Sequence, residues 1–171
     1  KFKDWKYIKN RRKQLRAFKN NSQTILDETC VLSYLHTNLF AAFVAWHRLF
    51  FVRKIIQKLK KNDSLLDFGA GTGEISYLYP YLSDYFFIED IDELSNYIIC
   101  NNPKAKKLDL LSLKEKEFGI ILCLDSLEHN DDYESLLQIL IKALKEDGVL
   151  ILSGPTENSL YKLGRLVSGF K

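Results

Sequence analysis

Hydrophobic residues recur with two different spacings along the chain. In the first sixty residues, apolar positions recur every three or four residues, a spacing that predicts helices. We expect these helices at residues 4–20, 24–36 and 38–60, with Asn38 as the N-cap of the third. From Ser64 onward, short apolar runs alternate with helical patterns, which predicts strands joined by helices. The organisation therefore changes near residues 60–64.

Five apolar runs in the second part are expected to be strands, at residues 65–68, 85–88, 105–108, 119–124 and 149–152. Among the intervening helices, one follows a capping-box-like pair, Asp131 and Glu134, and is expected to end at a C-cap at Gly148. A last helix is expected at 158–167. Strands alternating with helices form a parallel sheet covered on both faces. We therefore expect an α/β fold with a doubly wound, mostly parallel sheet, preceded by N-terminal helices.

Charge divides the chain in a similar way. Residues 1–61 hold 15 Lys or Arg and three acidic residues, whereas residues 62–171 hold 10 Lys or Arg and 19 acidic residues. A basic segment favours an anionic partner such as phospholipid or nucleic acid, although a solvated basic helix shows the same pattern. We expect residues 1–62 to form a basic helical region that acts as a lid or contacts an anionic membrane surface, and residues 63–171 to form a ligand-binding domain.

The three cysteines are widely separated, so the sequence predicts neither a disulfide framework nor a metal site. Free cysteines fit a cytoplasmic location. If the basic region binds lipid, we expect that location to be peripheral to the membrane. The longest apolar stretch, 39–56, is interrupted by His, Arg and Lys, so it does not predict a simple membrane span. The chain begins with Lys1 and contains no Met, so we expect it to be part of a longer protein.

Acidic residues follow four of the expected strands: Asp67, Asp90, Asp109 and Asp125. The carboxyl ends of parallel strands meet at one edge of the sheet, where folds of this class bind ligands. Asp67 suits an ammonium group, directly or through water. Asp90 suits two ribose hydroxyls, and Asp109 suits an adenine amino group, although it could equally be a capping or loop residue.

A glycine-rich turn, residues 69–73, directly follows the first of these strands. Its glycines allow a tight turn and a close approach to a ligand. A dinucleotide requires a third glycine where Glu74 stands, and its pyrophosphate would lie between Asp67 and Glu74. S-adenosylmethionine has no phosphate; its ammonium suits Asp67, and N–H groups of the turn can bind its carboxylate. An NAD-dependent oxidoreductase is therefore a disfavoured alternative.

The ordered motifs resemble those of class I S-adenosylmethionine-dependent methyltransferases. Residues 65–73 resemble motif I, residues 87–92 are similar to the ribose-binding strand end, and residues 118–129 resemble motif IV of the small-molecule branch (type 11/12-like). The resemblance covers about residues 62–155. It implies a Rossmann-like methyltransferase fold of seven strands, so the last two strands are expected to be missing here. Together with the preceding arguments, it gives these expected cofactor contacts: Asp67, Gly69, Ala70, Gly71, Gly73, Asp90, Ile91, Asp109, Leu110, Asp125 and Ser126.

The resemblance also implies transfer of a methyl group to a small-molecule or lipid-linked acceptor, with release of S-adenosylhomocysteine. His129 follows the fourth strand and is the candidate general base, although a polar loop residue would look the same. Residues 125–128 lack the Asn/Asp-Pro-Pro-aromatic turn that amino-group methyltransferases of nucleic acids carry, so nucleic acid is the less favoured acceptor. The basic region keeps an RNA-directed enzyme open, and a non-catalytic protein with the same fold is the other alternative.

Overall fold

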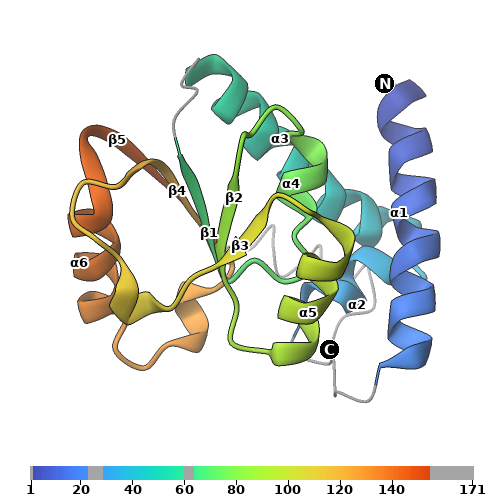
Figure 1. Cartoon of the computed structure of the whole chain (residues 1–171). Helices are drawn as coiled ribbons and strands as arrows, with labels where there is room; N and C mark the ends of the chain where they lie inside the picture. Colours follow the sequence, from blue (N-terminus) through green and yellow to red (C-terminus); the bar gives the residue numbers. More distant parts are fainter. Residues whose placement is uncertain (1, 23–28, 60–63, 155–171) are drawn as a thin grey trace, which may run out of the picture. The chain divides into compact units, whose positions relative to one another are not determined.

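A computed structural model of the chain describes residues 2–22, 29–59 and 64–154 (Figure 1). They belong to two units, a helical unit up to Phe50 and a sheet unit from Phe51 onward. The division between the units falls inside one long helix, whereas the composition of the chain changes at residues 60–64.

The helical unit contains α1 (Phe2–Asn21), α2 (Cys30–Leu35) and the first part of α3 (Leu39–Leu59). The predicted first and third helices are confirmed, while residues 23–28 of the predicted second helix lie outside the described residues. Asn38 caps α3 as expected. Its Oδ1 accepts hydrogen bonds from the N–H groups of Phe40, at 2.9 Å, and Ala41, at 3.4 Å.

Hydrogen bonds and ring contacts join the three helices of this unit. The Arg12 guanidinium donates to the carbonyls of Tyr34, at 2.6 Å, and His36, at 3.1 Å, and so satisfies the carboxyl end of α2. The buried Trp46 indole donates to the Tyr34 carbonyl at 3.3 Å, and its ring lies 5.9 Å from that of Tyr7. The basic first helix is therefore anchored by its partly apolar inner side.

The sheet unit is built on five parallel strands in the order β3-β2-β1-β4-β5. Their bounds are β1 (Leu65–Phe68), β2 (Tyr85–Ile88), β3 (Ala105–Lys107), β4 (Phe118–Leu124) and β5 (Leu144–Ser153). The order reverses between β1 and β4, which are direct neighbours. The prediction of a doubly wound parallel sheet is confirmed, and the reversal identifies the place where such a sheet opens to a ligand.

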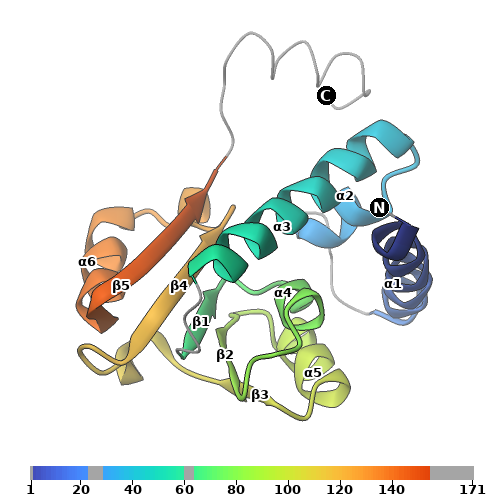
Figure 2. The same ribbon diagram turned by 90° about the horizontal axis from the view of Figure 1, so that it is seen from above.

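Helices cover both faces of this sheet. Figure 2 shows α4 (Glu74–Leu78) and α5 (Asp92–Asn101) on one face and α6 (Tyr133–Ala143) on the other. Two short 3₁₀ turns, η1 (Leu110–Ser112) and η2 (Leu127–His129), follow β3 and β4. Leu136 and Leu140 of α6 belong to a buried cluster with Leu66, Ile121 and Cys123 of the central strands. The long apolar run of β4 is thus buried, as expected of a central strand.

Two predicted features of α6 are wrong. The N-cap is Asp132, whose Oδ1 accepts the Ser135 N–H at 3.1 Å, so the predicted pair Asp131 and Glu134 stands one residue too early. The helix also ends at Ala143, before the predicted cap at Gly148.

Strand pairing explains the early end of α6. Leu144 already has extended backbone angles and pairs with Phe118 of β4. The register then shifts, so that Val149 pairs with Ile120 and Gly148 lies inside β5. The predicted helix at 158–167 lies outside the described residues.

Candidate functional site

The glycine turn lies where the strand order reverses, between the carboxyl ends of β2 and β4. On the β2 side, the N–H groups of Gly69 and Ala70 donate to the Ile88 carbonyl, at 3.0 and 3.3 Å. On the β4 side, a Cβ on Gly69 would stand 2.4 Å from the Ser126 Cβ. Gly69 also has a φ of 68°, in the left-handed region that favours glycine. The position therefore requires glycine both for its backbone angle and for its close neighbour.

Ser126, which follows β4, packs against the glycine turn. Its side chain is buried, and its hydroxyl donates to the Phe68 carbonyl at 3.2 Å and lies 3.1 Å from the Cys123 sulfur. Ser126 was predicted to contact the cofactor. The structure places its side chain against β1 and the turn, where it fixes the spacing between β1 and β4.

Glu89 joins the turn to the segment after β2. Its Oε2 accepts the Gly71 N–H at 2.7 Å, and its Oε1 accepts the Ile91 N–H at 3.1 Å. The side chain is buried, and burial raises the pKa of the carboxyl group, while the two N–H groups oppose that rise. Glu89 is therefore a buried carboxylate at the centre of the predicted cofactor site.

The sequence pattern favours Asp90 over Glu89, although Asp90 is exposed in the structure. The signal that could have found Glu89 is its place directly after the apolar run of β2. Successive side chains at a strand end point to opposite sides, so only one of two adjacent acids can face the turn. In the structure that residue is Glu89.

Asp67 lies inside β1 rather than at an open strand end. It is 3% exposed, and its Oδ2 accepts the Tyr85 hydroxyl at 2.5 Å. Burial raises the pKa of Asp67 to about 7; the hydrogen bond from Tyr85 opposes the shift and the charge of Glu89 adds to it. Asp67 therefore gains and loses its proton near neutral pH.

Four amides of the turn already have acceptors within the protein. Besides the bonds to Ile88 and Glu89, the Gly73 N–H donates to the Ala70 carbonyl at 2.9 Å. The prediction that turn N–H groups bind the cofactor's carboxylate can therefore apply only to amides other than those of Gly69, Ala70, Gly71 and Gly73.

The remaining predicted residues surround this centre at the same edge of the sheet. Ile91 precedes α5 as its N-cap, Asp109 is exposed after β3, and Leu110 begins η1 and packs against the core. The strand order places the end of β2, which precedes Ile91, between the ends of β1 and β3. The structure thus brings these residues to one edge.

On the β4 side, Asp125 and His129 follow the strand. Asp125 has a φ of 51°, and its Oδ1 accepts the Ser153 hydroxyl at 2.9 Å, which ties the end of β4 to the end of β5. His129 is exposed at the end of η2. The Asn130 amide donates to the Ser126 carbonyl at 2.9 Å and holds this segment beside the turn.

Glu74 is a third buried acid beside the turn, in the first helical turn of α4. Its Oε1 accepts the Thr72 hydroxyl at 3.1 Å. With Asp67 and Glu89, it makes the surroundings of the turn acidic at the point where a dinucleotide would place a pyrophosphate. These three acidic groups fit a cationic nucleoside such as S-adenosylmethionine and disfavour a diphosphate.

A cavity of about 290 Å³ lies at the opposite edge of the sheet. It is lined by Tyr85 at the start of β2 and by Pro103 and Lys104 before β3, together with Tyr79 and Pro80. It is therefore separate from the edge that carries the glycine turn.

Comparisons with known proteins give the family. Residues 41–168 match the family described as "Methyltransferase domain". The chain is 29% identical over 140 residues to the ubiquinone biosynthesis O-methyltransferase of Rickettsia typhi, a match that covers 71% of this chain and 56% of that protein. The chain thus spans little more than half the length of this curated relative.

Solved structures share the fold. The YcgJ protein of Bacillus subtilis superposes with a TM-score of 0.57 at 21% identity, over 70% of this chain and 58% of that one. An S-adenosylmethionine-dependent methyltransferase from Mesorhizobium loti superposes with a TM-score of 0.52 at 16% identity, over 64% of this chain and 52% of that one. The motifs, the sheet and the family match lead to one conclusion: the chain belongs to the class I S-adenosylmethionine-dependent methyltransferases.

Proposed function

We propose that this chain carries the S-adenosylmethionine-binding site of an enzyme that transfers a methyl group to a small-molecule or lipid-linked acceptor. The observation that carries the proposal is the position of Glu89, a buried carboxylate bonded to the turn at Gly71. With Asp67 and Glu74, it surrounds the turn with acidic groups that a cationic nucleoside compensates.

Each residue has a proposed part in holding the cofactor. Glu89, rather than the exposed Asp90, accepts the ribose hydroxyls, because its oxygens lie against the turn. Asp67 acts from within β1 on the ammonium group, directly or through water, and binds it best when ionised. Gly69, Ala70, Gly71 and Gly73 give the cofactor a close approach to the backbone.

S-adenosylmethionine supplies a methyl group already activated by the positive charge on sulfur. The chain's own contribution is alignment of that group with the acceptor, which is worth up to about 7–11 kcal/mol in well-oriented systems. His129 is the proposed general base, because it is exposed on the β4 side of the turn, where it can take a proton from an acceptor. A base contributes roughly 10²–10⁴-fold when the acceptor must lose a proton.

The acceptor class rests on the relative from Rickettsia typhi, whose name specifies O-methylation in ubiquinone biosynthesis. That name supports a small organic acceptor and an oxygen nucleophile for this chain.

Calorimetric titration tests the cofactor assignment. We expect micromolar binding of S-adenosylmethionine and S-adenosylhomocysteine, and no binding of NAD, by the full chain. Binding of NAD without competition from S-adenosylhomocysteine would refute the assignment. Incubation with labelled S-adenosylmethionine and a metabolite or lipid extract then tests transfer: label in an organic product supports an enzyme, whereas cofactor binding without any labelled product favours the non-catalytic alternative.

A further inference from the structure

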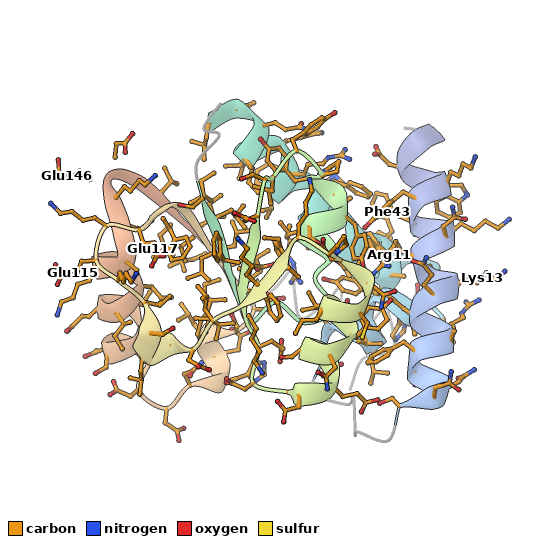
Figure 3. The ribbon with its side chains drawn as sticks, in the orientation of Figure 1. Arg11, Lys13, Phe43, Glu115, Glu117 and Glu146 are labelled. Atoms are coloured by element: carbon orange, nitrogen blue, oxygen red, sulfur yellow. The ribbon has the colours of Figure 1, made fainter. Side chains whose placement is uncertain are left out.

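Four basic side chains lie exposed along one side of α1: Lys6, Lys9, Lys13 and Arg16. Their spacing of three, four and three residues aligns them on a single helical line, named here the cationic stripe. Figure 3 shows Lys13 on the side of α1 opposite to Arg11, which is buried. The stripe therefore faces away from the inner side that anchors α1.

Little negative charge compensates the stripe within the helical unit. Its described residues include nine Lys or Arg, against Asp4 as the single acid. Within that described part, no ion pair or hydrogen bond engages the four side chains of the stripe. Arg12, in contrast, is already used to cap α2. The stripe thus presents free positive charge, which attracts anions over roughly one Debye length, about 8–10 Å.

The same unit exposes apolar side chains. Trp5 is 60% exposed and stands one turn before Lys9, at the border of the stripe. On α3, Phe40 is 60% exposed, and Phe43 and Val44 are each 53% exposed, at helical spacing. Of these side chains, Trp5 borders the stripe on α1 itself, and an exposed Trp among Lys and Arg is typical of helices that lie at a lipid–water interface.

We propose that α1 docks on an anionic phospholipid surface, with the cationic stripe on the headgroups and Trp5 at the interface. Two stripes facing each other would repel, so symmetric self-association through this face is disfavoured. A single-stranded RNA would also match the charge and can stack a base on Trp5, and the vesicle and RNA measurements below distinguish it from lipid. Among the described helices, none is long and apolar enough to cross a bilayer. This proposal does not depend on methyl transfer.

Flotation with vesicles tests the docking. The full chain is mixed with vesicles of phosphatidylcholine, with and without about 30% phosphatidylglycerol. We expect binding only to the anionic vesicles, weakening as salt increases. The triple variant Lys9→Glu, Lys13→Glu, Arg16→Glu is expected to bind at least about tenfold more weakly, because each basic residue near the surface contributes to attraction. The matched control reverses the exposed Lys58, Lys114 and Lys142, which gives the same change in net charge.

Further variants keep the test decisive. Lys9→Gln, Lys13→Gln, Arg16→Gln retains helix propensity, and circular dichroism checks that α1 persists. Trp5→Ala is expected to weaken binding to anionic vesicles while leaving its salt dependence unchanged. The proposal is overturned if the Lys58, Lys114 and Lys142 control loses as much binding to anionic vesicles as the stripe variant, or if the wild type does not bind vesicles. A stripe variant that no longer binds single-stranded RNA but still binds anionic vesicles also overturns it, in favour of RNA. A concentration-dependent dimer abolished by Phe43→Ser overturns it in favour of self-association.

Discussion

The Tyr85 hydroxyl donates a 2.5 Å hydrogen bond to the Asp67 carboxylate between two neighbouring strands, and neither side chain reaches solvent. Asp67 pairs with Phe87 in the β1–β2 register, and Tyr85 stands two residues before Phe87 on the same face. The phenol thus reaches diagonally across the sheet to an acid that is otherwise desolvated. This pair links the core of the sheet to the glycine turn that begins two residues after Asp67.

The Asp67 carboxyl group should make folding stability depend on pH. Its pKa rises from 3.8 to about 7 on folding, so the folded state holds the proton more tightly. The resulting stabilisation is fully present below about pH 4 and is lost as pH rises through about 7. Because each pH unit between these two pKa values is worth 1.36 kcal/mol, the loss in the free energy of unfolding is at most about 4 kcal/mol.

Urea unfolding of wild type and Asp67→Asn across this pH range measures the effect. Asn keeps the acceptor for Tyr85 but does not titrate, so the wild type should lose stability relative to the variant as pH rises. A difference between the two proteins that stays constant with pH would contradict the assignment.

Gly69→Ala should destabilise the sheet unit, because the new Cβ would stand 2.4 Å from the Ser126 Cβ. Overpacking of this kind costs about 1–3 kcal/mol, and the left-handed backbone adds about 1–2 kcal/mol for a residue with a Cβ. Ser126→Gly in the same chain removes the clash but not the backbone cost. Denaturant midpoints should therefore show partial rescue in the double variant; full rescue, or none, would contradict this reading of the contact.

Glu89 and Asp90 give the sharpest comparison of adjacent residues. Glu89→Ala should weaken binding of S-adenosylhomocysteine at least about tenfold, because hydrogen bonds to a charged group are worth about 1.5–3 kcal/mol. Glu89→Gln should show an intermediate loss, since the amide oxygen can still accept one N–H group. Asp90→Ala is the matched control, and calorimetry should find its affinity close to that of the wild type. The reverse order of the two alanine variants would restore the sequence-based assignment to Asp90.

Glu89 and Asp90 also show which features of the site can be predicted from the sequence and which cannot. The apolar runs at 65–68 and 85–88 became strands with the predicted bounds, because a buried strand depends mainly on its own residues. The turn and its glycines were also recognisable, since a left-handed backbone restricts the residue type. Which of Glu89 and Asp90 faces that turn depends on where β2 ends, and a shift of one residue reverses the answer.

Contacts that depend on strand register could not be predicted from the sequence. The bond from Tyr85 to Asp67 requires the pairing of β1 with β2, and the packing of Ser126 under Gly69 requires β4 beside β1. Gly148 has the sequence of a helix cap, but the pairing of Leu144 with Phe118 ends α6 earlier. Tertiary pairing overrode the local signal there.

His129→Ala should separate catalysis from cofactor binding. Because His129 is exposed at the end of η2, its loss should leave affinity for S-adenosylhomocysteine unchanged. If it acts as the base, kcat should fall by roughly 10²–10⁴-fold, with a change in the pH profile. Once an acceptor is identified, steady-state kinetics at a series of pH values measures both kcat and its pH profile. An unchanged kcat with an unchanged profile would make His129 an ordinary loop residue.

The central claim is that the cofactor lies against the glycine turn at the carboxyl edge of the sheet, and amide chemical shifts test it most directly. Titration of the ¹⁵N-labelled chain with S-adenosylhomocysteine should shift the amides of residues 69–73 and 89–91 first and most strongly. The amides of residues 101 and 102, beside the cavity at the opposite edge, should stay unshifted. Shifts confined to residues 101–104, with the turn unaffected, would contradict the account.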